Sequence, residues 1–297
     1  MDTISILADR CIRCGRCVKA CPSSVFGQEK AGAAVTVDAP ESCIGCGHCA
    51  AACPAAAMQH AGFPPEKVHP VDRSQLPAPE QLMLLCRARR SNRALSRRPV
   101  PSEAIDRILD SAHCAPTASN MQQVAFTVLT DPADLRFVVE YTLGFCRRML
   151  RLLEMPVLGA LVRKCVKGAG RYRHSMRRLI DAYELQGCDR VLRGATALIF
   201  IHTPADSRFG AIDCQLAYQN GSLMAEALGV SQIYTGFVLT ALRADRKNRL
   251  ARHFAIGGTI HAGMALGMPE FAFPNYIDRK PLDATYRHKN YSTSKNV

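Results

Sequence analysis

The hydrophobic and polar positions of residues 80–290 predict a mixture of helices and strands. Apolar residues recur with the helical period in three segments, which we expect to be helices: 80–90, 102–113 and 215–228. Short apolar runs predict three strands: 126–130, 197–201 and 257–266. A long, mostly helical region lies between the first two strands, at about 133–186. This order of elements is typical of an α+β domain.

The first sixty residues are organised by cysteines instead. The run Cys-x-x-Cys-x-x-Cys-x-x-x-Cys-Pro occurs at 11–22 and again at 43–54, with a short predicted strand at 35–37 between the copies. The next stretch holds five prolines, and such a density favours an extended linker over a helix. The sequence therefore predicts a small domain, a proline-rich linker, a second domain and a frayed tail, at 1–60, 61–79, 80–290 and 291–297 respectively.

The doubled cysteine run limits the chemistry of the small domain. Disulfides and zinc are the alternatives, but zinc sites usually show two Cys-x-x-Cys pairs rather than two triplets each followed by Cys-Pro. Both copies match the run that holds [4Fe–4S] clusters in bacterial ferredoxins. The N-terminal region thus resembles two-cluster bacterial ferredoxins.

That resemblance implies two [4Fe–4S] clusters, because the fourth cysteine of each run serves the other cluster in such proteins. It gives two ligand sets: Cys11, Cys14, Cys17 and Cys53 for one cluster, and Cys43, Cys46, Cys49 and Cys21 for the other. Nearby glycines would let backbone N–H groups approach the sulfurs: Gly15, Gly45 and Gly47. The other six of the fourteen cysteines show no ligand spacing, and we interpret them as small buried apolar residues: Cys86, Cys114, Cys146, Cys165, Cys188 and Cys214.

Charge is distributed unevenly along the chain. The formal net charge is +13, yet residues 1–60 carry five basic and five acidic side chains. Residues 141–193 carry twelve basic and four acidic side chains, so most of the surplus lies there. We interpret the basic insert, residues 140–190, as amphipathic helices that cover a pocket. Docking of an acidic redox partner and peripheral contact with an anionic membrane remain alternatives. With few aromatic residues and no nucleic-acid motif, nucleic acid is not an expected partner.

Five segments of the second domain, in order, resemble the FMN-dependent nitroreductase family. They are Arg89-Arg90-Ser91-Asn92-Arg93, the loop 116–122, Arg193-Gly194-Ala195, the stretch from Asp213 through Gln219-Asn220 to Tyr234-Thr235-Gly236, and Leu266-Gly267-Met268-Pro269 with Arg279-Lys280-Pro281-Leu282-Asp283. Clustered guanidinium groups suit a phosphate dianion. Three positions depart from the family pattern: Thr117 replaces serine, Thr196 replaces proline, and Gln122-Gln123-Val124 replaces Gln-Pro-Trp.

The resemblance implies FMN bound at the interface of a homodimer. The expected FMN-binding residues are Arg89, Arg90, Ser91, Arg93, Pro116, Thr117, Asn120, Gln122, Tyr234, Thr235, Gly236 and Arg279. In this family the flavin itself carries out the chemistry, so no catalytic side chain is assigned.

The two resemblances together predict an oxidoreductase that passes electrons from [4Fe–4S] clusters to FMN and reduces a small organic acceptor: a nitroaromatic, a quinone or an activated alkene. The alternative function is an electron-transfer module that serves a protein partner. A ferredoxin and NAD(P)H are both candidate electron donors. The absence of an apolar run of about 18 residues argues against a transmembrane helix, and we expect a cytoplasmic protein.

Overall fold

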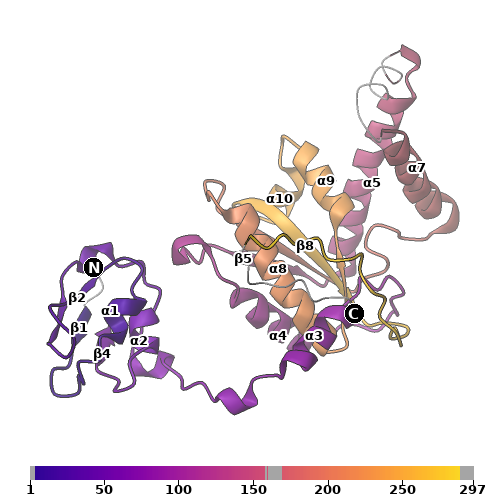
Figure 1. The fold of residues 1–297 in the computed structure, drawn as a ribbon. Coiled ribbons are helices and arrows are strands. Elements are labelled where there is room, and N and C mark those ends of the chain that lie inside the picture. Colours follow the sequence, from indigo (N-terminus) through magenta and orange to yellow (C-terminus); the bar gives the residue numbers. More distant parts are fainter. Residues whose placement is uncertain (1–3, 158, 160–168, 288–297) are drawn as a thin grey trace.

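The computed structural model describes residues 4–157, 159 and 169–287. The predicted tail at 291–297, Cys165 and the part of the basic insert at 160–168 lie outside the described residues. The described chain forms a small N-terminal unit and a larger unit, joined by an extended segment (Figure 1).

The N-terminal unit consists of two antiparallel strand pairs and two short helices. β1 (Ile4–Ile6) pairs with β4 (Met58–His60), and β2 (Phe26–Gln28) pairs with β3 (Val35–Val37). The short helices α1 (Arg16–Ala20) and α2 (His48–Ala51) each follow the second cysteine of a run and contact each other. A 3₁₀ turn at Pro40–Ser42 leads into the second run. The unit therefore repeats one strand–helix arrangement, as the repeated sequence does.

Gly15 and Gly47 allow these two helices to begin. Their φ angles are 67° and 71°, a left-handed conformation that costs glycine little and other residues more. The fully buried apolar core of this unit is small and centres on Val25, Phe26 and Cys49. A unit of this size with so few buried side chains generally needs a metal or disulfide to be stable.

The segment 61–79 is extended and carries two 3₁₀ turns, at Pro65–Lys67 and Arg73–Gln75. Its side chains are mostly exposed. It leads into α3 (Pro79–Ala88), which has proline at its first position, where a missing N–H group is tolerated.

The larger unit is built on one antiparallel sheet with the strand order β5-β6-β8-β7. The strands are β5 (Ala125–Leu129), β6 (Ala197–Thr203), β8 (Thr259–Gly267) and β7 (Ser231–Tyr234). A register shift between Ile201 and His202 leaves His261 of β8 without a paired residue on β6. The sheet is irregular at this point, as β-bulges next to functional sites often are.

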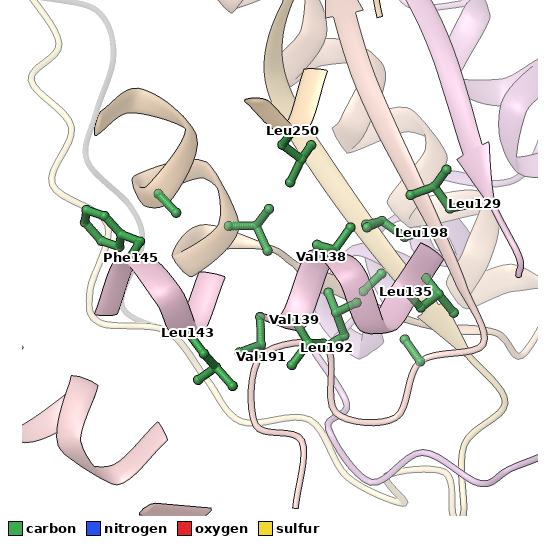
Figure 2. Close-up of a cluster of buried hydrophobic side chains, with 14 of the residues drawn as sticks. Leu129, Leu135, Val138, Val139, Leu143, Phe145, Val191, Leu192, Leu198 and Leu250 are labelled. Carbon is green, nitrogen blue, oxygen red and sulfur yellow. The ribbon is translucent and has the colours of Figure 1, made fainter. Parts of the chain in front are cut away.

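Helices cover both faces of the sheet, which explains why β6 is apolar along its length. On one face lie α4 (Ser102–His113) and α8 (Gly210–Ala227), packed on Ala197, Ile199 and Ile201. On the other face lie α5 (Pro132–Glu154), α9 (Gly236–Ala244) and α10 (Arg249–His253). Figure 2 shows this second core, in which Leu135, Val138 and Val139 of α5 lie near Leu198 of β6.

The basic insert forms the outer half of α5 together with α7 (Ala169–Gln186), and the two helices pack against each other. Figure 1 shows the pair extending beyond the sheet. Arg147 forms ion pairs with Glu140 and Glu184, and Arg177 pairs with Glu154. Exposed pairs of this kind stabilise by less than about 1 kcal/mol each, so they orient the helices more than they hold them together.

The C-terminal segment returns along the start of the larger unit. The N–H of Ser96 donates to the carbonyl oxygen of Met268 (2.8 Å), and the N–H of Glu270 donates to that of Ala94 (3.0 Å). The buried side chain of Asn92 donates to the carbonyl oxygen of Phe271 (2.9 Å). These bonds join segments far apart in sequence and fix the chain just after Arg89–Arg93.

The structure confirms the mixed helix and strand class and most of the predicted elements. The helix predicted at 102–113 is α4, and the one predicted at 215–228 is α8, which begins five residues earlier. Gly229, with φ of 68°, follows the end of α8 as expected. Three elements of the larger unit, β7, α9 and α10, were not predicted. Among the described residues, none of the helices is both long and apolar enough to cross a membrane.

Candidate functional site

The eight cysteines of the two runs line two separate cavities. Cys11, Cys14, Cys17 and Cys53, which we call the first cysteine set, line one of them. Cys21, Cys43, Cys46 and Cys49, the second cysteine set, line the other. Each cavity thus takes three sulfurs from one run and the fourth from the other run. This is the grouping that the ferredoxin resemblance implied.

Backbone N–H groups approach the sulfurs at equivalent places in both copies. The N–H of Val25 lies 3.3 Å from Cys21 Sγ, and the N–H of Ala57 lies 3.2 Å from Cys53 Sγ. The N–H of Gly45 lies 3.4 Å from Cys43 Sγ, as the glycine-rich spacing predicts. Such donors stabilise thiolates and their metal complexes.

Burial of the thiols has the opposite effect on their ionisation, because it disfavours the charged thiolate and raises the pKa. Burial, together with the neighbouring Cys43 and Cys46, raises the pKa of Cys49 to about 11. Burial also raises the pKa of Cys17, and Cys53 and Cys11 contribute in the same direction. Because only thiolates bind metal, loading these sites must release protons.

The donor set fits an iron–sulfur cluster better than zinc or disulfides. Every cysteine in the described part of the chain has a free thiol. Among the same residues, no group of three or more side chains is arranged to hold a single metal ion. Zinc needs four sulfurs at about 2.3 Å from one point, whereas a cube of iron and sulfide keeps its ligands farther apart.

The packing interpretation of the remaining cysteines is correct for only some of them. Cys146 and Cys214 are buried in the two cores of the larger unit. Cys86, Cys114 and Cys188 are exposed, so for these three the expectation of buried packing residues was wrong. Cys86 lies in α3, a helix without buried residues, Cys114 directly follows α4, and Cys188 lies in a loop, so none of the three is on a buried apolar stripe.

The arginine segment predicted to bind a phosphate lies beside the C-terminal half of α8. The N–H of Arg90 bonds to the carboxylate of Glu226, and the Arg89 guanidinium lowers the pKa of both Glu226 and Tyr218, although burial raises each of them more. Asn92 is buried and bonds to backbone groups, so it shapes the segment. Arg89, Arg90 and Ser91 are half-buried, whereas Arg93 is exposed.

Arg193 is an additional candidate for the anion site. Burial lowers its pKa, and the positive charges of Arg93 and Arg190 lower it further. Its φ of 62° is strained for a residue with a side chain. Neighbouring guanidinium groups are good donors for a phosphate, so Arg93 and Arg193 are candidates to hold an anion. The residue was noticed only as part of a family-like segment, because a single arginine carries no signal of its own.

The loop predicted to bind the flavin lies elsewhere on α8. Pro116, Thr117, Asn120 and Gln122 line a cavity next to Ala217. The N–H of Ala118 donates to Asp213 Oδ1 (3.2 Å), and Thr117 Oγ1 accepts from the N–H of Gln122 (3.0 Å). Three residues of the loop have positive φ angles: Ser119 (50°), Asn120 (54°) and Gln122 (49°). Strain of this kind often marks ligand-binding loops.

Asn120 also contacts the N-terminal unit. Its Nδ2 donates to the carbonyl oxygen of Gly45, 2.7 Å away, within the second cysteine run. No local pattern predicts this contact, because it joins residues 75 positions apart. The loop 116–122 is therefore next to the second cysteine set.

One chain does not bring all predicted FMN residues together. The loop is held at Asp213 and the arginine segment at Glu226, thirteen residues apart on the same helix. A rise of about 1.5 Å per residue separates these points by roughly 20 Å. Arg279 is exposed, and within the described part of the chain it makes no hydrogen bond or ion pair.

The segment Tyr234-Thr235-Gly236 carries an unsatisfied buried hydroxyl. Thr235 is 2% exposed, and its Oγ1 has no hydrogen-bond partner within the described residues. The exposed Tyr234 hydroxyl accepts a hydrogen bond from Gln215 Nε2 (3.1 Å). An unpaired buried hydroxyl costs about 1–3 kcal/mol, which a bound ligand would offset. This orphaned group fits the proposed flavin position.

We expect Thr235→Val to stabilise the flavin-free protein and, at the same time, to weaken its binding of FMN. Removing the unpaired hydroxyl should raise the free energy of unfolding of the flavin-free protein by about 1 kcal/mol. The same change should weaken FMN binding by about fivefold to tenfold, measured by fluorescence titration. Thr142→Val is the control, since Thr142 is buried but already donates to the carbonyl oxygen of Val138. Unchanged FMN affinity in Thr235→Val would contradict this role.

Two histidines near this segment were missed by the sequence analysis. His202 Nε2 lies 3.0 Å from Thr127 Oγ1, and His261 Nε2 lies 3.2 Å from Thr203 Oγ1. The carbonyl oxygen of His261 accepts from Gln215 Nε2 (2.9 Å), the group that also bonds Tyr234. The β-bulge determines where these two histidines lie, and the pattern of apolar residues along the sequence does not show a bulge.

The pKa values of these two histidines predict how the stability of the protein depends on pH. Burial lowers the pKa of His202, as does the charge of His261, and burial followed by Arg243 lowers that of His261. Both are therefore neutral in the folded state when unfolded chains, with a pKa near 6.5, begin to protonate. Their contribution to stability is present above about pH 6.5 and is lost as pH falls through the lowered pKa values.

We expect the melting temperature to fall between about pH 6.5 and pH 5, and His202→Gln to reduce that fall. Scanning calorimetry in buffers of constant ionic strength measures it. The exposed His48, replaced by glutamine, is the matched control. An equal pH dependence in wild type and His202→Gln would show that this pair does not titrate as described.

Comparison with known proteins identifies both units. The profile of the nitroreductase family matches residues 86–268, more than half of the chain. The chain belongs to the nitroreductase family. A 4Fe-4S dicluster domain matches residues 3–54, so the fused architecture that the sequence predicted is confirmed. Membership confirms an oxidoreductase of nitroreductase type, and no curated protein matches the chain.

Solved structures agree on the fold of the larger unit. A nitroreductase with bound FMN from Bacteroides fragilis is 19% identical, covers 69% of this chain and 95% of its own, and has a TM-score of 0.50. One with bound FMN from Desulfitobacterium hafniense is 18% identical, with coverages of 68% and 97% and a TM-score of 0.51. An FMN-dependent nitroreductase from Clostridium difficile is 17% identical, with coverages of 70% and 100% and a TM-score of 0.50.

Proposed function

We propose that this protein is an iron–sulfur flavoprotein that passes electrons from two [4Fe–4S] clusters to FMN and reduces a small organic acceptor, such as a nitroaromatic, a quinone or an activated alkene. The observation that supports it most is the division of eight cysteines into two sets of four, each around its own cavity, in a chain of the nitroreductase family. When bound, the clusters supply single electrons and the flavin accepts one or two.

The chain's own residues have distinct roles in this proposal. The first and second cysteine sets would each hold one cluster, with backbone N–H groups near Cys21, Cys43 and Cys53. Arg93 and Arg193 would receive the phosphate of FMN, and the Thr235 hydroxyl would bond to the flavin. Tyr234 Oη accepts from Gln215 and donates no hydrogen bond to the described residues, so its proton would be available to a bound ligand.

The separation of the FMN residues along α8 supports a homodimer with shared sites. The exposed face of α8 carries apolar side chains: Phe209 just before the helix, Ile212 and Leu216, with exposures of 41%, 59% and 41%. Its opposite face is buried on the sheet, so the start of the helix has apolar side chains on both its buried and its exposed face, as in helices covered on both sides. A second copy on α8 would bring the loop of one chain to the arginine segment of the other.

We expect Leu216→Glu to produce monomers that have lost most of their FMN, because a buried carboxylate at a dimer interface is unfavourable. Light scattering coupled to size exclusion, with flavin absorbance, measures both together. Leu185→Glu is the matched control, since Leu185 is 80% exposed on α7. A Leu216→Glu monomer that keeps its FMN would contradict the shared site.

Small-acceptor reduction is tested directly in the reconstituted protein. Under anaerobic conditions the protein is reduced with NADH, NADPH or a reduced ferredoxin in separate stopped-flow runs, which also identifies the donor class. Nitroaromatic, quinone and alkene acceptors are then added. We expect rapid return of the oxidised flavin absorbance with at least one acceptor. Reoxidation by a partner protein alone would overturn the enzyme assignment.

One observation favours the second candidate, an electron-transfer module for a protein partner. The α5–α7 pair extends beyond the sheet and carries basic side chains that make no ion pair within the described residues, among them Arg148, Arg173 and Arg178. Such a surface favours an acidic partner. Steep salt dependence of reoxidation by that partner would support this candidate.

A further inference from the structure

The two halves of the N-terminal unit differ at one position next to a sulfur. The second run follows the first by 32 residues, so Cys11 matches Cys43 and Gly15 matches Gly47. By the same offset, Gln28 at the end of β2 matches His60 at the end of β4. The repeat thus places a glutamine beside the first cysteine run and a histidine at the cavity of the second cysteine set.

His60 donates a hydrogen bond to a sulfur of the second cysteine set. The side chain is 5% exposed, and its Nε2 lies 3.5 Å from Cys43 Sγ. Its Nδ1 accepts a hydrogen bond from the N–H of Gly62 (3.0 Å), so the neutral ring must carry its proton on Nε2. Phe63 packs on the ring, with centroids 4.9 Å apart. The orientation of the donor is therefore fixed from three sides.

Gln28 makes no such bond in the first half. Its Nε2 donates to the carbonyl oxygens of Arg13 (3.0 Å) and Ala33 (2.8 Å). Both amide protons are therefore used by the backbone, and none is left for a sulfur of the first cysteine set. Among the residues that the structure describes, the second set has a side-chain donor to sulfur, His60, and the first set has none.

An extra donor has a definite effect on a metal centre ligated by thiolates. Reduction adds negative charge to the centre, and a hydrogen bond to a ligand sulfur stabilises that charge. The reduction potential of the centre therefore rises. The second set is also the one in contact with the larger unit, because Asn120 Nδ2 donates to the carbonyl oxygen of Gly45.

We infer that His60 gives the cluster of the second cysteine set a higher reduction potential than that of the first, so that electrons taken up by the N-terminal unit collect beside the flavin loop. This inference rests on the two clusters of the proposed function. His60 is a positioning residue: it acts on the cluster through its contact with the ligand Cys43 and touches neither substrate nor flavin. No external reagent is required, because one electron leaves the first cluster as the second accepts it.

The test is a potentiometric titration of the anaerobically reconstituted full-length protein, followed by electron paramagnetic resonance. Wild type should show two separate midpoints. In His60→Leu the higher midpoint should fall, so that at a fixed potential the ratio of reduced to oxidised second cluster drops about tenfold, or 59 mV for one electron. The lower midpoint should stay in place.

Two further variants separate this role from a structural one. His60→Gln places an amide donor near the same sulfur and should keep most of the separation. His69→Gln, exposed in the extended segment 61–79, should leave both midpoints unchanged. If iron content is complete and neither midpoint moves in His60→Leu, or only the lower one moves, the inference is wrong. If wild type holds no clusters, the proposed function fails instead. If wild type holds clusters but reduces no acceptor, the two potentials can still be measured, and the inference is tested separately.

Discussion

Replacing Cys46 by alanine should lower the iron content from about eight to about four atoms per chain while FMN stays bound. Cys46 lines the cavity of the second cysteine set, and a cluster with three remaining thiolates is held poorly. Because the first set lies around a different cavity, its cluster should survive. Iron and acid-labile sulfide analysis, beside the flavin absorbance, measures the three quantities on one sample.

Cys14→Ala should give the same loss from the other cavity, and the double variant should lose nearly all iron. Cys188→Ala is the matched control, since this thiol is exposed and lies in neither set. The grouping by cavity makes the result specific: each single variant removes one cluster and spares the other. Loss of all iron from either single variant would mean that the eight cysteines do not form two independent sets.

The second large effect concerns the phosphate site. Replacing Arg93 and Arg193 together by alanine should weaken FMN binding on the order of 100-fold or more, because each guanidinium bond to a phosphate contributes about 1.5–3 kcal/mol. The flavin-free protein should not lose stability, since the positive charge of Arg93 already opposes that of Arg193. Isothermal titration with FMN, next to thermal melting of the flavin-free protein, measures both.

A double variant that removes the same charge elsewhere is the control: Arg107→Ala with Arg173→Ala, both exposed. Arg89→Ala with Arg279→Ala tests the arrangement that the family resemblance implied. Arg279 makes no hydrogen bond or ion pair within the described part of the chain, so its effect should appear only in the dimer. Unchanged FMN affinity in the Arg93/Arg193 variant would place the phosphate elsewhere.

The parts of the fold that depend on local patterns could be predicted from the sequence. The helix α4 has an apolar stripe, proline before it and no competing signal, and its predicted ends agree with the observed ones. The cysteine runs carry their own spacing, and α8 is apolar over its length. For α8 the start was misplaced, because Gly210–Cys214 is as apolar as the rest of the helix but lacks a capping side chain.

The parts that depend on distant contacts could not be predicted. Asn120 meets Gly45 only through the folded chain, and His60 reaches Cys43 only because β4 pairs with β1. The unpaired Thr235 hydroxyl is visible only once its neighbours are placed. Arg193 next to Arg93 is equally hidden, since a hundred residues separate them. In each case the functional feature is a relation between side chains rather than a property of either one.

The most direct test of this account is the composition of anaerobically purified and reconstituted protein, determined as iron, acid-labile sulfide, zinc and FMN per chain. The account predicts about eight irons, about eight sulfides, about one FMN and no stoichiometric zinc. Zinc in the cysteine cavities, or iron without any bound flavin, would contradict it.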